Sequence, residues 1–163
     1  MAGTYDFDNE IVITTRSRNG SPGVNIVTPV RIPGSDTAVL VNRGWVYAPD
    51  GMTVDLARWR EPPNMTGDAY VESFQTRPGD VKSTTVANAW RWMDRPTLSS
   101  RFSYPIAPYY LVLMGNSANP PANVPPRVPV PPLDEGSHKS YAFQWFAFAA
   151  ISFIGMILFL RRK

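Results

Sequence analysis

The chain has 163 residues, enough for one domain of ordinary size with little left over. Its net charge is +3, but three of its 16 basic residues stand together at positions 161–163, which leaves 13 to balance its 13 acidic residues. The surplus is therefore a terminal cluster and does not indicate a nucleic-acid-binding face. No cysteine is present, which excludes disulfides and thiolate metal sites.

The first ten residues, "MAGTYDFDNE", contain the one tight group of carboxylates, Asp6, Asp8 and Glu10. These three alternate along a presumed strand, so the pattern predicts that they lie on one solvent-exposed strand face. A calcium site is the alternative, although supporting carbonyls or waters are not evident in the sequence.

The region 1–118 is predicted to be a β-rich domain. Its β-branched and alternating runs, separated by turn formers, favour strands over 10–16, 24–32, 37–48, 68–74 and 109–114. A helix is expected over 86–102, restarted or capped near Pro96. The fold class predicted is therefore α+β: a mainly antiparallel, barrel-like β domain with a short helical insertion.

The tryptophans of this domain complicate the predicted helix. Trp90 and Trp92 stand two apart and cannot share one helix face, which favours an extended or loop conformation there. Trp59 and Trp90 are either core residues or partner contacts.

Residues 119–136 form a proline-rich segment, with seven prolines between Pro120 and Pro132. Such a run is typical of stiff polyproline II structure and cannot pair as a central strand. We interpret it as a spacer or as an edge strand laid along the domain.

Residues 137–160 are predicted to form a transmembrane helix, followed by a basic cytoplasmic tail at 161–163. From Tyr141 to Leu160 only Gln144 and Ser152 interrupt the apolar run, and about 20 such residues span a bilayer core. The basic tail favours a cytoplasmic or matrix C-terminus, with the β-rich domain outside the cytoplasm.

This topology raises a question about the N-terminus. Residues 1–10 show neither a basic nor an apolar export signal, so we expect that an N-terminal transmembrane helix is missing from this sequence. A tail-anchored protein with its domain in the cytoplasm is the alternative.

Nothing in the sequence indicates an enzyme. The single histidine, His138, stands at the membrane boundary, so the usual nucleophile–base arrangements have no base within the domain. No glycine-rich phosphate or dinucleotide motif is present.

Several stretches together resemble the surfeit locus protein 1 (Surf/Shy) family of cytochrome c oxidase assembly factors. They are "GTYD" at 3–6, "GVNIVTPVRI" followed by "TAVLVNRGWV", "RPTLSSRFSYPIAPYYLVL" and "HKSYAFQWF" at 138–146. The resemblance covers almost the whole chain. Family members have two transmembrane helices around a domain in the periplasm or intermembrane space, and we expect that the first of these is the helix missing from this sequence.

The resemblance implies a non-enzymatic role in maturing subunit I of a haem-copper oxidase, with partners in the haem a synthesis machinery and in membrane lipid, but not nucleic acid. It places the chain in the bacterial inner membrane, or the mitochondrial one if the source is eukaryotic. It also implies haem a binding, with His138 as a proposed axial ligand.

The chemistry of the residues near His138 is compatible with that role, since imidazole is a good iron ligand. On a helix, Tyr141 and Trp145 share the face of His138 and can stack against a haem ring; Ala142, Ala149 and Ser152 leave room for it. The alternatives are an interfacial aromatic belt and a helix-packing surface, with no cofactor bound. Gln144 points to the other side, towards a neighbouring helix or the headgroups.

Arg43 and Trp45, in "VNRGWV", are candidate partner-binding or structural residues. Arg43 could pair with a haem propionate or with the oxidase, or it could stack on Trp45 or bond a loop carbonyl. The residue types alone favour the structural role.

Overall fold

The computed structural model describes residues 3–76, 82, 86–115, 121–129 and 138–162. The chain divides into two compact units, Met1–Val130 and Pro131–Lys163, which are called the sheet unit and the helix unit below.

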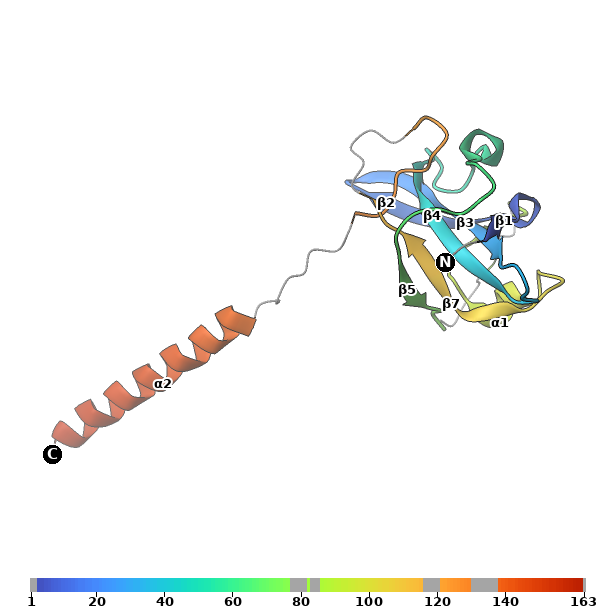
Figure 1. Ribbon diagram of the computed structural model, residues 1–163. Helices are drawn as coiled ribbons and strands as arrows, with labels where there is room; N and C mark the ends of the chain where they lie inside the picture. The colour runs from blue at the N-terminus through green and yellow to red at the C-terminus, as the bar shows by residue number, and fades with distance from the viewer. Residues whose placement is uncertain (1–2, 77–81, 83–85, 116–120, 130–137, 163) are drawn as a thin grey trace. The chain divides into compact units, whose positions relative to one another are not determined.

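The sheet unit is built on one mixed β-sheet whose strands follow the order β5-β7-β4-β3-β2-β6, with β1 paired to β3 (Figure 1). Its elements are β1 (Thr4–Tyr5), η1 (Phe7–Asn9), β2 (Ile11–Arg18), β3 (Ser21–Arg31), β4 (Ala38–Tyr47), η2 (Leu56–Trp59), β5 (Ala69–Ser73), β6 (Ala89–Trp90), α1 (Arg95–Ser99) and β7 (Ile106–Leu113).

The predicted fold class is confirmed. Most neighbouring strands pair antiparallel: β3 pairs in this way with β1, β2 and β4, and β5 pairs in this way with β7. The pairs β2–β6 and β4–β7 are parallel. Among the described residues the sheet does not close into a barrel: it ends at β5 on one side and at β6 on the other.

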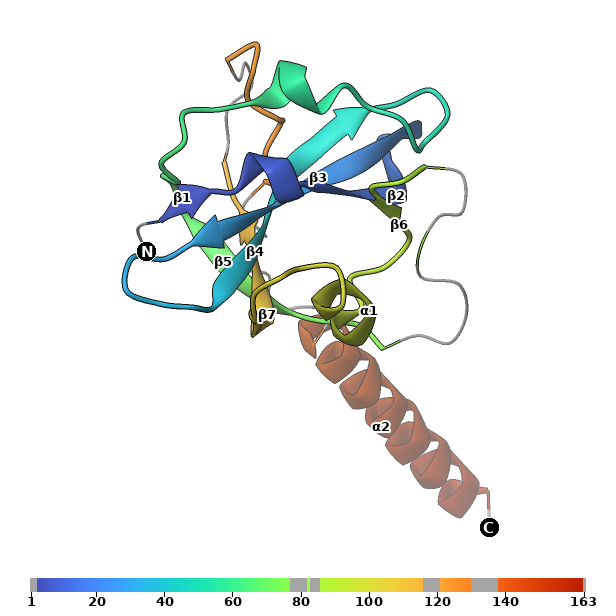
Figure 2. The same ribbon diagram turned by 90° about the vertical axis from the view of Figure 1, so that its right-hand side faces the viewer.

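Both faces of the sheet are buried, because successive side chains of a strand point to opposite sides and each side has its own cover. On one face Ile11, Ile13 and Leu40 pack with Leu98 of α1. On the other face the strands are covered by β1 and η1 at one end and by the segment of η2 at the other, as Figure 2 shows.

The prediction of a helix over 86–102 is wrong for most of that range. Residues 89–90 form β6, paired with β2, and only Arg95–Ser99 are helical. The side chain of Asp94 caps α1 by accepting from the backbone N–H of Thr97 at 3.0 Å, and Pro96 stands in its first turn. Pairing with β2 thus overrides helix propensity up to the cap.

The helix unit contains α2, His138–Arg161. Lys139–Arg161 is the one described helix that is long and apolar enough to cross a membrane, and none of its most apolar window is buried within the protein. The mean hydropathy of that window is 2.0.

Candidate functional site

The face of α2 that carries position 138 offers large, uncovered aromatic groups. Tyr141 and Trp145 lie one and two turns beyond His138, and they are 59% and 70% exposed. Trp145 makes an edge contact with Phe148, at 6.3 Å between ring centroids. This face therefore has apolar area available for lipid, a partner helix or a planar ligand.

The second candidate region is centred on Arg43 in β4, whose side chain is fully buried. Its Nη2 donates to Glu10 Oε1 at 2.5 Å, its Nη1 to Glu61 Oε1 at 2.9 Å, and its Nε to the hydroxyl of Thr28 at 2.8 Å. Nη1 also donates to the carbonyl of Trp59 at 2.7 Å. The guanidinium is thus saturated by groups of the sheet unit, a geometry that favours the structural interpretation.

Glu10 is part of this buried network and not of an exposed acidic face. Burial raises the pKa of its carboxyl, while the charge of Arg43 and the hydroxyl of Thr28 oppose the rise. Asp6 follows β1 and Asp8 lies in η1, so the prediction of one shared strand face is wrong. Over the part of the chain that the structure describes, no group of three metal-ligating side chains is found.

The first part of the proline-rich segment is held against β4. The side chain of Arg127 donates to the carbonyl of Arg43 and to Glu61. The carbonyl of Pro126 accepts from the backbone N–H of Trp45 at 3.0 Å. Gly44, at φ +142°, permits this approach, because a Cβ there would stand 2.5 Å from the oxygen of Pro126. Residues 125–128 therefore line the end of β4, while residues 119, 120 and 130–136 of the segment lie outside the described residues.

Trp45 lies against the β2–β3 hairpin. Its indole N–H donates to the carbonyl of Arg16 at 3.0 Å. One side of the ring packs on Gly23, where a Cβ would collide with it. Trp45 also lines a shallow hollow, together with Arg18 and Pro129.

The candidate residues fall into two sets in different units: Arg43 and Trp45 in the sheet unit, and His138, Tyr141 and Trp145 on α2. The sequence analysis missed the partners of Arg43, namely Thr28, Glu61 and Arg127. No local spacing could have indicated them, because they lie 15, 18 and 84 positions from Arg43 along the chain. The two other tryptophans in question are placed differently, with Trp90 in the core and Trp59 half-buried.

Comparison with known proteins gives two findings. A family model described as "SURF1 family" matches residues 1–150. A SURF1-like protein of Monosiga brevicollis is 26% identical over 185 aligned residues, which cover the whole of this chain and 65% of that relative. The chain thus spans 65% of the length of that relative. No solved structure matches significantly.

Proposed function

The chain belongs to the SURF1 family, and from this we infer that it is a membrane-anchored assembly factor for a haem-copper terminal oxidase. The family is known for cytochrome c oxidase assembly and is one of non-catalytic assembly factors. The match over residues 1–150, which includes both the sheet unit and the first half of α2, is the observation that carries the proposal.

We propose in addition that the chain assists delivery of haem a to subunit I of the oxidase. His138 would ligate the iron through its imidazole, and Tyr141 and Trp145 would pack against the ring. The exposed aromatic surface of α2 supports this assignment, since it can cover the apolar part of a haem. Bound there, haem would be a cargo that the helix orients and shields from water.

The location we propose is the inner membrane of a bacterium or mitochondrion, with the sheet unit outside the cytoplasm or matrix. Support comes from the length and hydropathy of α2 and from Arg161 and Arg162 at its end. Protease protection of the sheet unit in right-side-out vesicles tests the sidedness: digestion from outside is expected, and protection would indicate a cytoplasmic domain.

A cofactor-free scaffold for an assembly intermediate of subunit I is the second candidate function. It is favoured by Ala142, Ala149 and Ser152, which share the face of position 138 and allow close approach of another helix. In this case Tyr141 and Trp145 contact a protein partner or the membrane interface, and the haem a synthesis machinery acts elsewhere.

The deciding experiment is an absorption spectrum of the chain, purified in mild detergent from cells that make haem a. His138→Ala is compared with Gln144→Ala, a matched change on the opposite side of the same helix. We expect a haem spectrum in the wild type and in Gln144→Ala, and its loss in His138→Ala. A colourless wild-type protein that still supports oxidase assembly would establish the scaffold in place of haem delivery.

A further inference from the structure

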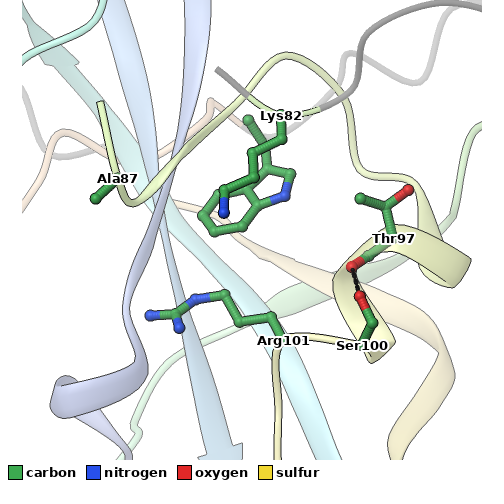
Figure 3. Close-up of a pocket in the computed structure, with 6 residues that line it drawn as sticks. Lys82, Ala87, Thr97, Ser100 and Arg101 are labelled. Carbon is green, nitrogen blue, oxygen red and sulfur yellow. Dashed lines mark hydrogen bonds between the residues drawn. The ribbon is translucent and has the colours of Figure 1, made fainter. Parts of the chain in front are cut away.

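A cavity of about 230 Å³ lies beside Trp90 in the sheet unit, and its lining shares no residue with the Arg43 network. It is lined by Trp90, Lys82, Ala87, Thr97, Ser100 and Arg101. Figure 3 shows Thr97, Ser100 and Arg101 on the α1 side of this cavity and Lys82 on a separate segment. The described lining contains two cations and no acidic side chain.

Trp90, which lines the cavity, carries a buried donor with no acceptor. Trp90 is 2% exposed, yet its indole N–H has no hydrogen-bond partner. Burying a donor without an acceptor is costly, and native proteins rarely leave one without a role. The residue is firmly placed, because its backbone is paired with Ile13 on one side and bridged to Lys82 on the other.

Two cations lie close to the same indole. The guanidinium carbon of Arg101 is 5.6 Å from a ring centroid of Trp90, and the ammonium nitrogen of Lys82 is 5.7 Å from it. One terminal nitrogen of Arg101 donates to the side-chain oxygen of Asn88 at 3.3 Å. Its Nε–H is buried and has no partner, which makes it a second donor without an acceptor.

The hydroxyl groups of the lining are already engaged. Thr97 donates to Asp94 at 2.6 Å, and Ser100 donates to the carbonyl of Thr97 at 2.8 Å. Asp94 caps α1 and is not among the residues that line the cavity. The donors left for a ligand therefore include the indole N–H of Trp90, the Nε–H and further terminal N–H groups of Arg101, and the ammonium of Lys82.

We propose that this cavity binds an oxyanion, a carboxylate or phosphate group, through Trp90, Arg101 and Lys82. Such a group is an acceptor with several lone pairs and a negative charge, so it satisfies both orphaned N–H groups and neutralises the two cations. The site is separate from the haem role proposed for α2 and does not depend on it.

The test uses the full chain, labelled with ¹⁵N-tryptophan in detergent micelles, and follows its five indole N–H signals in a heteronuclear correlation spectrum. Trp90→Phe assigns the signal of Trp90; Trp→Phe changes at the four other positions assign it by elimination if that variant does not fold. Inorganic phosphate, acetate and a short-chain phosphatidylglycerol are added in separate titrations at constant ionic strength. The anion whose titration saturates at the lowest concentration identifies the preferred ligand: phosphate indicates a free phosphate, acetate a carboxylate, and phosphatidylglycerol a lipid headgroup.

We expect a saturable shift of the Trp90 signal with at least one of these anions. Arg101→Gln should weaken the affinity for the anion about tenfold, since it removes a charge-assisted donor. Lys82→Gln should weaken the affinity less, because that side chain is exposed. Arg58→Gln is the matched control: Arg58 also lies over a tryptophan, Trp59, but outside the cavity. A signal that none of the anions moves, or a shift that is equal in Arg101→Gln and wild type, would overturn the proposal.

Discussion

The two units of this chain differ in which side chains they bury and which they leave exposed. The sheet unit buries even a charged residue, Arg43, and surrounds it with two carboxylates, a hydroxyl and a carbonyl. Helix α2 has no charge between Lys139 and Arg161 and leaves its aromatic and aliphatic side chains uncovered. A buried charge is tolerable only where protein groups pair it, and an exposed apolar helix only where the solvent is apolar.

The difference shows where each unit obtains its stability. The sheet unit has a core on both faces of its sheet, and its buried Arg43 is bonded to groups of the same unit. For α2 the stabilising surroundings must come from lipid or from another protein, because none of its apolar window is buried in the chain. Substitutions in the two units should therefore be detected by different measurements, unfolding for one and membrane insertion for the other.

The largest expected effect is that of Arg43→Met, a change of similar length that removes the charge. It leaves Glu10 buried without its cation and should lower the free energy of unfolding of the sheet unit by about 3–5 kcal/mol. Denaturant unfolding of the full chain in detergent, followed by tryptophan fluorescence, measures this. The exposed Arg58→Met should stay within about 0.5 kcal/mol of wild type. Equal stability of the two variants would contradict a structural role for the Arg43 network.

The next effect belongs to α2. Ala150→Lys places a charge at the middle of the helix, where insertion into a bilayer costs about 2.5–3.5 kcal/mol. We expect a reduced fraction of the protein in carbonate-washed membranes and unchanged unfolding of the sheet unit. Thr66→Lys, on the exposed surface of the sheet unit, should change neither. Full membrane retention of Ala150→Lys would show that α2 does not span the bilayer.

Features that depend on local pattern could be predicted from the sequence. The five long strands and α2 agree with their predicted ranges to within a few residues, since alternation and a continuous apolar run are local signals. The parallel pairs β2–β6 and β4–β7 could not be predicted, because they join segments separated by dozens of residues. The same contact with β2 explains why the helix expected over 86–102 does not form in its first part, where residues 89–90 are β6.

The candidate sites divide in the same way. The positions of Tyr141 and Trp145 relative to His138 follow from helix geometry alone. The groups bonded to the guanidinium of Arg43 are 15 to 33 positions away along the chain, and no spacing rule connects a buried arginine to carboxylates at such distances. The orphaned indole of Trp90 likewise becomes visible only when Lys82 and Arg101 are placed beside it.

Two glycine-to-alanine changes, one in each unit, compare how the units tolerate an added methyl group. Gly44→Ala in β4 combines a φ of +142° with a collision against the carbonyl of Pro126, so it should lower the stability of the sheet unit by about 1–3 kcal/mol. Gly155→Ala in α2 meets no atom within 4 Å and replaces a poor helix former with a good one. Thermal unfolding should separate the two variants; an unchanged melting temperature in Gly44→Ala would mean that residues 125–128 do not lie against β4 in solution.

The smallest effect concerns a single side-chain hydrogen bond within the sheet unit. The hydroxyl of Tyr104 donates to Asp6 at 2.6 Å, and Tyr104→Phe should cost about 1 kcal/mol at pH 7. Burial, together with this bond, raises the pKa of Tyr104 above its ordinary value. The folded state then holds the phenolic proton more tightly than the unfolded state does, so this stabilisation is complete below about pH 10 and is lost as the pH rises through the folded-state pKa. The difference in unfolding free energy between wild type and Tyr104→Phe should therefore shrink in alkaline solution, and a difference that stays constant up to pH 12 would show that the phenol ionises equally in both states.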